Sequence, residues 1–209
     1  FKHSSLNTEH AAFFEIGPGP GTFYNFLRTK KISNYQAVDA GVNVIKTFQK
    51  YFPEKPDIII QGNAIEFLQN NPLRKYDCVL ASMILEHLED NDLMKLITLV
   101  VQSLNPGGEF WIHVPCAESI LYSYSRYYDL THRRSFTVNN FSFLAEAFNM
   151  KITAKSGKII AITGFKTFIK YMHNQYIYWI NRFLFAFIIG VRRNIGVFSE
   201  ELTIILKKN

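Results

Sequence analysis

Closely spaced glycines beside an acidic residue mark the first place in this chain where chemistry could occur. A short apolar run ends at Glu15 and is followed by Gly17, Gly19 and Gly21, with Thr22 opening a stretch of helical spacing. Glycines directly after a buried strand let the backbone turn tightly and approach a ligand. The N-terminus of the following helix can hold an anionic group. The pattern favours a cofactor-binding loop over an ordinary glycine-rich turn between a strand and a helix.

A second acidic residue follows about 20 residues after the glycines, as in dinucleotide-binding folds. Asp39 ends the apolar run 35–39, at the carboxyl end of an expected strand, where open α/β sheets bind ligands. Its carboxylate can accept hydrogen bonds from both hydroxyls of a ribose. A nicotinamide-binding loop, G-x-G-x-x-G, would require Gly or Ala where Thr22 stands. A nicotinamide oxidoreductase is therefore a distant alternative.

Two histidine-containing segments are candidates for acid–base chemistry, because the pKa of histidine suits a general base near neutral pH. His87 follows Glu86 directly after an expected strand at 76–82, and it is either substrate-facing or structural. His132 lies in the segment 129–137, before an expected helix at 139–148. Asp129 could orient the ring of His132, and Arg133 could hold a phosphate or carboxylate. The alternative is a polar loop in which Asp129 merely caps a turn.

Elements that would position these residues alternate along the chain. Strands are expected at 13–15, 35–39, 57–64, 76–82, about 109–112 and 201–208, with helical stretches between most of them. This order predicts one α/β domain over residues 1–209, with a mainly parallel sheet and helices on both faces.

Taken in order, these motifs resemble the class I S-adenosylmethionine-dependent methyltransferases over residues 11–160 and 198–208. The first motif of that family is acid-x-Gly-x-Gly-x-Gly, and a Leu-x-Pro-Gly-Gly turn like that at 104–108 is frequent in it. The resemblance implies a Rossmann-like sheet of seven strands, mostly parallel, with an antiparallel C-terminal strand. It also implies S-adenosylmethionine as cofactor and S-adenosylhomocysteine as product. Because relatives often carry an N-terminal helix over the cofactor, we expect part of that lid to precede Phe1.

The resemblance also assigns cofactor-binding residues. The family often has Asp-Ala where this chain has Asn63 and Ala64, and the acid accepts from the adenine amino group; the amide oxygen of Asn63 can still accept. The complete expected set is Glu15, Gly17, Gly19, Gly21, Asp39, Asn63, Ala64, Ser82 and Met83.

Two further resemblances concern metal and acceptor. Ubiquinone-type O-methyltransferases have Glu-x-x-Glu-His at 83–87, and in some of them these groups hold a divalent metal. Met83 replaces the first acid here, so we expect no metal site. The segment 129–137 is similar to the Asp-Pro-Thr-His-x-Arg-x-Phe-Thr pattern of bacterial methyltransferases found with sugar and surface-polysaccharide biosynthesis, with Leu130 in place of Pro.

We therefore expect O-methylation of a small-molecule or sugar or glycan-precursor acceptor. His132 is the candidate base, Asp129 and His87 are further catalytic candidates, and Arg133 and Tyr128 are candidates for binding the acceptor. Aromatic packing would explain Tyr128 and the neighbouring tyrosines equally well. An N-methyltransferase acting on an amino sugar or amine, and a non-catalytic cofactor-binding scaffold subunit, are the alternatives.

The segment 164–195 departs from a minimal fold. Its apolar residues recur at helical spacing, and Asn181 and Arg182 leave too short an apolar run to span a membrane. Packing in the core or in a homodimer is favoured, while the basic residues Arg192 and Arg193 leave peripheral membrane contact open.

Charge and cysteine content restrict which binding partners and which cellular location we expect. The net charge is +6, but the basic residues are scattered and no RNA-binding module is visible, so nucleic acid is not an expected partner. The two cysteines, Cys78 and Cys116, make no disulfide framework. We expect no signal peptide at the start. We expect a cytoplasmic protein. The 164–195 segment also allows a location at the membrane surface.

Overall fold

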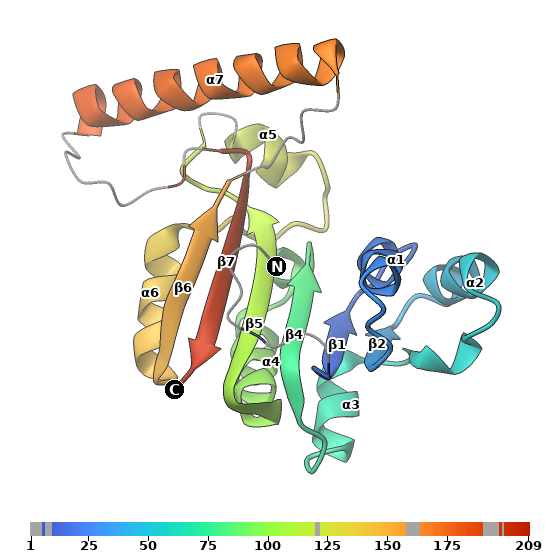
Figure 1. Ribbon diagram of the computed structural model, residues 1–209. Coiled ribbons are helices and arrows are strands. Elements are labelled where there is room, and N and C mark those ends of the chain that lie inside the picture. Colours follow the sequence, from blue (N-terminus) through green and yellow to red (C-terminus); the bar gives the residue numbers. More distant parts are fainter. Residues whose placement is uncertain (1–5, 7–9, 120–121, 158–163, 190–196, 198) are drawn as a thin grey trace.

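The computed structural model describes residues 6, 10–119, 122–157, 164–189, 197 and 199–209. Its seven strands form one sheet in the order β3-β2-β1-β4-β5-β7-β6 (Figure 1). The bounds are β1 Phe13–Ile16, β2 Tyr35–Asp39, β3 Ile59–Gln61, β4 Tyr76–Ser82, β5 Leu104–Pro115, β6 Met150–Ser156 and β7 Glu201–Lys208. Strands β1 to β5 are parallel, and β7 pairs antiparallel with both β5 and β6. The predicted Rossmann-like sheet is confirmed, and β6 is the strand for which no range was predicted.

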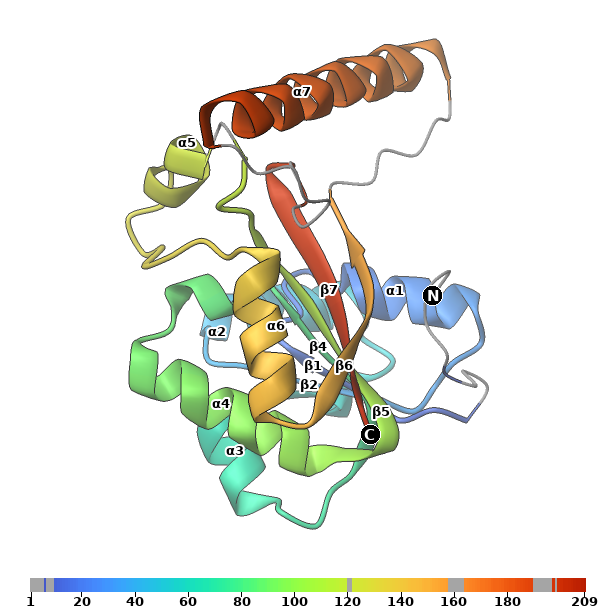
Figure 2. The same cartoon turned by 90° about the vertical axis from the view of Figure 1, so that its left-hand side faces the viewer.

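Helices cover both faces of the sheet (Figure 2). Buried side chains of α1 (Thr22–Thr29) and α2 (Val42–Tyr51) join one hydrophobic cluster, which includes Phe13. Buried side chains of α3 (Ala64–Asn70), α4 (Asp90–Ser103) and α6 (Val138–Ala147) join the other, which includes Phe14. Because successive side chains of a strand point to opposite faces, the neighbours Phe13 and Phe14 each anchor one of the two cores.

Short elements complete the carboxyl edge of the parallel strands. The 3₁₀ turn η2 (Leu85–His87) follows β4 at this edge, whereas η1 (Pro56–Ile58) precedes β3 at the opposite edge, where it occupies the start of the third predicted strand. Helix α5 (Tyr122–Tyr127) lies beyond the carboxyl end of β5. The arrowheads of β4 and β5 point to this edge of the sheet in Figure 1. The sites expected at strand ends are thus gathered at one edge.

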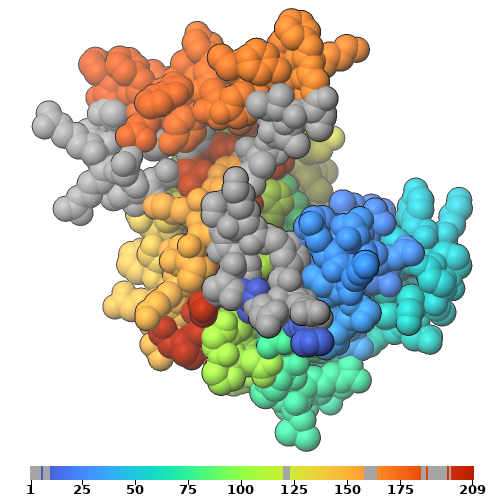
Figure 3. Space-filling model, in the orientation of Figure 1, coloured from blue at the N-terminus to red at the C-terminus, as the bar shows by residue number. Residues whose placement is uncertain are grey.

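Helix α7 (Phe165–Ile189) confirms the predicted helical segment, and residues 190–195 of that segment lie outside the described residues. The expected packing of its apolar stripe in the core is wrong, because the stripe faces outward. Its exposed members are Phe165, Phe168, Ile169, Met172, Tyr176, Trp179, Phe183 and Phe187. In the space-filling view α7 forms a ridge along the top of the molecule (Figure 3). Across the described part of the chain, no helix combines the length and apolar character that crossing a membrane requires.

Candidate active site

The three glycines of the loop after β1 have left-handed backbone conformations but different surroundings. A Cβ on Gly17 would collide with the side chain of Ile84, and one on Gly21 would lie 2.8 Å from Cε2 of Phe48. A Cβ on Gly19 would meet no atom within 4 Å. Gly21 therefore serves the packing of α1 against α2, while Gly19 borders open space that a ligand can fill.

A pocket with an empty volume of about 640 Å³ opens beyond the ends of β1 and β2, next to this loop. Its walls are mostly apolar, with carboxylate and amide groups at a few positions. The lining residues are Ile16, Gly17, Val38, Asp39, Ala40, Gly62, Asn63, Ala64, Ile65, Ile84, Leu88, Asp92 and Leu96.

Asp39 presents one carboxylate oxygen to this pocket. Its Oδ1 accepts a hydrogen bond from the backbone N–H of Gly41 at 2.7 Å, which fixes the side chain. Its Oδ2 lies on the side of Gly17, where the glycine leaves room. Partial burial raises the pKa of Asp39 above its usual value. The placement fits a carboxylate that accepts from ribose hydroxyls, as the sequence predicts.

Glu15 lies away from the pocket. It is 3% exposed and accepts a hydrogen bond from the hydroxyl of Tyr35 on β2. Burial raises the pKa of Glu15 to about 7. It is absent from the pocket lining, so its position in the structure is that of a buried support beneath the glycine loop.

Asn63 lines the pocket, but its amide oxygen is already used. Oδ1 of Asn63 accepts from the backbone N–H groups of Ile65 and Glu66, which caps the N-terminus of α3. Helix capping thus already uses the oxygen that the sequence predicts to accept from an adenine amino group. Ala64, the first residue of α3, lines the pocket as expected.

The end of β4 differs from expectation as well. Ser82 and Met83 are half-buried but do not line the pocket, whereas Ile84 and Leu88 do. Met83 has a left-handed backbone with φ 53°, and its N–H donates to the carbonyl of His113 at 2.8 Å. This turn carries the chain back so that Ile84 covers Gly17. Apolar residues after a strand are a weak sequence signal, and for that reason Ile84 and Leu88 were missed.

The turn η2 brings two of its own side chains close to a third from a distant segment. Glu86 and His87 come from the turn itself, and His132 comes from the loop before α6. Nε2 of His132 lies 4.0 Å from Oε1 of Glu86, and the rings of His87 and His132 have centroids 4.8 Å apart. None of the three lines the pocket, but Ile84 and Leu88, the residues that flank η2, do.

Hydrogen bonds define the tautomers of both histidines. Nδ1 of His132 lies 2.8 Å from the carbonyl oxygen of Ser125, which can only accept, so Nδ1 carries the proton. Thr131 donates its hydroxyl proton to Asp129 at 2.6 Å, so Nδ1 of His87, 2.8 Å away, donates to Thr131. Nε2 of each neutral ring is therefore left with its lone pair.

The predicted role of Asp129 is corrected by these contacts. Asp129 accepts from both the N–H and the hydroxyl of Thr131, and these hydrogen bonds lower its pKa. The ring of His132 is oriented by Ser125 instead. Asp129 acts on His87 through Thr131, because the turn at 129–132 folds its carboxylate back onto its own backbone.

Glu86 has an unusual environment. Its side chain is fully buried, and neither carboxylate oxygen has a hydrogen-bond partner among the described residues. Burial raises the pKa of Glu86 to about 7. An unpartnered buried carboxylate is costly and needs a proton or a cation.

These three residues also fit a divalent metal, which the sequence did not predict. One ligand atom from each of Glu86, His87 and His132 lies within 4.8 Å of the others. Two imidazoles and one carboxylate suit transition-metal ions better than magnesium. With Nε2 as the ligand atom, the hydrogen bonds at both Nδ1 atoms would orient the two rings. His132 is far from Glu86 in the sequence, so spacing gave no signal for this set.

The two expected acceptor-binding residues lie on the surface. The guanidinium of Arg133 pairs with Glu89 at 2.7 Å, and both side chains are more than half exposed. Tyr128 is 76% exposed, with its ring 5.4 Å from that of Tyr124. Neither residue lines the pocket.

Comparisons with known proteins agree with this geometry. A family model described as a methyltransferase domain matches residues 4–155. No curated protein matches significantly. A SAM-dependent methyltransferase from Archaeoglobus fulgidus has 21% identity and a TM-score of 0.69, and the match covers 96% of this chain and 87% of that chain.

Two further solved structures share the fold. A SAM-dependent methyltransferase from Clostridium acetobutylicum has 13% identity and a TM-score of 0.64, covering 95% of this chain and 84% of that one. A Haloferax volcanii methyltransferase in complex with the Trm112 activator has 12% identity and a TM-score of 0.68, covering 97% and 85%. Because the family model matches residues 4–155, which are most of the chain, the chain belongs to the methyltransferase-domain family and is a SAM-dependent methyltransferase.

Proposed function

We propose that this methyltransferase acts on a hydroxyl oxygen of a small-molecule, sugar or glycan-precursor acceptor, with His132 as the proton acceptor. The observation that carries this proposal is the bare Nε2 of His132, held beside Glu86 next to the pocket. The resemblance of the 129–137 segment to methyltransferases of sugar biosynthesis supports the choice of acceptor. We place the reaction in the cytoplasm, with no nucleic acid as acceptor.

S-adenosylmethionine, which the pocket beside Gly17 and Asp39 would hold, would supply the methyl group for displacement by the acceptor oxygen. Nε2 of His132 would take the hydroxyl proton of the acceptor. The carbonyl of Ser125 keeps the ring in the required tautomer. The imidazolium that forms gains the carboxylate of Glu86 as a partner 4.0 Å away. Positioning supplies most of the remaining rate enhancement.

The test is a screen of sugar and small hydroxyl acceptors, followed by S-adenosylhomocysteine release. With an accepted substrate, His132→Ala should lower turnover by roughly 10²-fold or more, as for loss of a general base. The affinity for S-adenosylhomocysteine should stay unchanged. The exposed His10→Ala is the matched control and should have wild-type activity. Full turnover by His132→Ala, with an unchanged pH profile, would remove His132 from this role.

A bound divalent cation is the second candidate for the same residues. The two unpartnered oxygens of buried Glu86 favour it. A cation held by Glu86, His87 and His132 would lower the pKa of a bound acceptor hydroxyl. With Met83 in place of the first acid, we expect turnover to survive chelation. Loss of activity in EDTA, restored by manganese or zinc, would replace the general-base role with metal binding.

Two alternatives have distinct signatures. Turnover only with amines or amino sugars would indicate N-methylation. Binding of S-adenosylmethionine without turnover on any acceptor would indicate a scaffold subunit.

A further inference from the structure

Helix α7 exposes an apolar stripe where a surface helix of a globular domain normally exposes polar side chains. Such helices turn their apolar stripe towards the core. In α7, 25 residues long, Phe165 is 77% exposed and Phe187 is 78% exposed, and their stripe is continuous between them. The polar Asn181 is fully buried on the opposite side. The outward face is therefore an apolar surface about 38 Å long, at 1.5 Å per residue.

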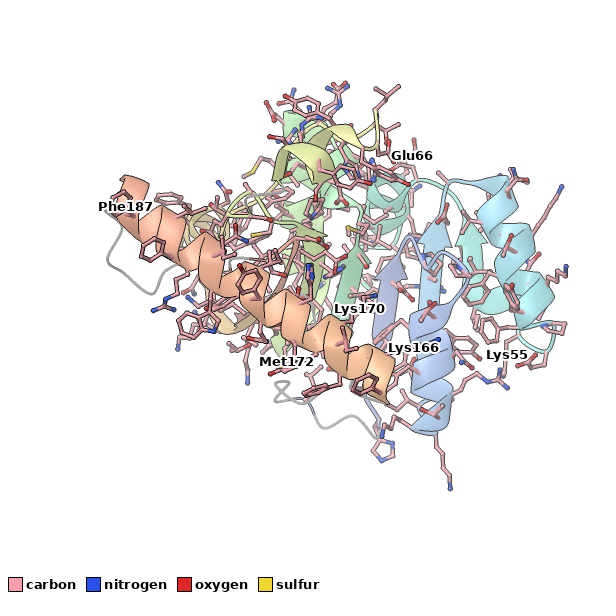
Figure 4. The ribbon with its side chains drawn as sticks, turned by 90° about the horizontal axis from the view of Figure 1, so that it is seen from above. Lys55, Glu66, Lys166, Lys170, Met172 and Phe187 are labelled. Atoms are coloured by element: carbon pink, nitrogen blue, oxygen red, sulfur yellow. The ribbon has the colours of Figure 1, made fainter. Side chains whose placement is uncertain are left out.

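The charges on α7 all have one sign. Lys166 and Lys170 are exposed beside the apolar stripe, and Arg182 lies near its C-terminal half, with its guanidinium 5.7 Å from the ring centroid of Trp179. The 25 residues contain no Asp or Glu. Figure 4 shows Lys166, Lys170, Met172 and Phe187 along this helix, which crosses in front of the domain when seen from above.

Lipid fits these features better than a second copy of the chain. In a two-fold dimer, α7 would face α7 of the second copy. The lysine and arginine side chains beside the stripe would then meet positive charges, and the helix has no acidic side chain to pair with them. A bilayer surface accepts the apolar stripe, lets basic side chains reach phosphate groups, and suits Trp and Tyr at its boundary.

We propose that α7 lies in the interface of a phospholipid bilayer that contains anionic lipid, with its apolar stripe inserted among the acyl chains. Because α7 lies beyond the carboxyl ends of β4 and β5 (Figure 1), this contact holds the active-site edge of the sheet towards the membrane.

Vesicle flotation tests the proposal. The full chain should float with vesicles of equal parts phosphatidylcholine and phosphatidylglycerol, and much less with phosphatidylcholine alone. Ile169→Glu combined with Met172→Glu should weaken binding at least about tenfold, because two apolar side chains leave the bilayer. Phe143→Glu on α6, 70% exposed, is the control for an added charge elsewhere and should bind like the wild type.

Charge and fluorescence give independent readouts. Lys166→Gln with Lys170→Gln should weaken binding to the anionic vesicles, whereas Lys46→Gln with Lys50→Gln, exposed at the same spacing on α2, should not. The emission of Trp179, 61% exposed, should shift to the blue on binding. Trp111 is already buried and should contribute no shift.

Three results would overturn the proposal: no flotation of the wild type, equal flotation of wild type and the Ile169/Met172 variant, or a lipid-free dimer that this variant dissociates. The last result would assign the stripe to a second copy. Calorimetry with S-adenosylhomocysteine checks that each variant is folded, and it tests cofactor binding separately from membrane binding.

Discussion

At the scale of single residues, the candidate site depends on which nitrogen of each histidine carries a proton. The hydroxyl of Thr131 links Asp129 to His87, and the carbonyl of Ser125 orients His132. Asp129 and Ser125 thereby leave Nε2 of both histidines bare, and Nε2 of His132 lies 4.0 Å from the buried carboxylate of Glu86. A proton acceptor and a metal ligand need the same arrangement, so chelation is the experiment that separates them.

The link through Thr131 can be tested by a double-mutant cycle. We expect Asp129→Asn and Thr131→Val each to lower turnover by roughly tenfold, because each breaks a charge-assisted chain of hydrogen bonds to His87. Combined, they should cost no more than one alone, since both act through the same ring. Additive losses in turnover would show that Asp129 acts elsewhere. Unchanged affinity for S-adenosylhomocysteine is the control for folding.

At the scale of elements, the glycines of the loop after β1 have two different roles: one borders the space for a ligand, and another allows α1 and α2 to pack. Gly19 borders open space, whereas a side chain on Gly21 would meet Phe48 and Phe52 of the α2 segment. The same residue type in one motif thus serves two purposes.

This division predicts different losses for two substitutions. Gly19→Val should abolish S-adenosylhomocysteine binding in calorimetry with only a small fall in Tm, because its side chain enters the ligand space and strains the backbone by about 1–2 kcal/mol. Gly21→Val should lower Tm markedly, because it forces α1 away from α2. The wild type should bind no NAD. A Gly19→Val protein with normal cofactor affinity would move the cofactor away from this loop.

At the scale of the whole molecule, buried carboxyl groups make stability depend on pH. Burial raises the pKa of Glu15 from 4.5 to about 7. A group with a raised pKa binds more protons in the folded than in the unfolded protein. Its contribution to the free energy of unfolding is therefore fully present below about pH 4.5 and is lost as pH rises to about 7. The pKa of Glu86 is also raised by burial, so Glu86 makes the free energy of unfolding fall with rising pH in the same way.

Glu15→Gln should remove this dependence at one position while keeping an acceptor for Tyr35. Between about pH 5 and pH 8, the Tm of the wild type should fall relative to that of the variant by several degrees, at about 2–4 °C per kcal/mol. Thermal denaturation at both pH values measures the difference. For the control Glu66→Gln, on the exposed face of α3, the Tm should change with pH as it does for the wild type. A constant difference in Tm would mean that Glu15 stays ionised in the folded protein.

Local signals in the sequence were sufficient for most of the fold. Apolar runs ending in turn residues located β1, β2, β4 and β7, and helical spacing located α7. The third strand was placed too early because Pro56–Ile58 forms a 3₁₀ turn, and β6 was not located. In β6 only alternate residues are buried or half-buried beside β7, so its apolar run is weak.

The sequence by itself determined the class of chemistry, because the glycine loop and Asp39 need only local backbone geometry and a fixed strand-to-strand order. The tertiary structure decided what depends on contacts between distant segments. It brought His132 to Glu86, turned Asp129 towards His87 through Thr131, and used the oxygen of Asn63 as a helix cap. It also decided which way α7 faces: helical periodicity places apolar residues on one side of a helix, but only packing determines whether that side meets the core or the surroundings.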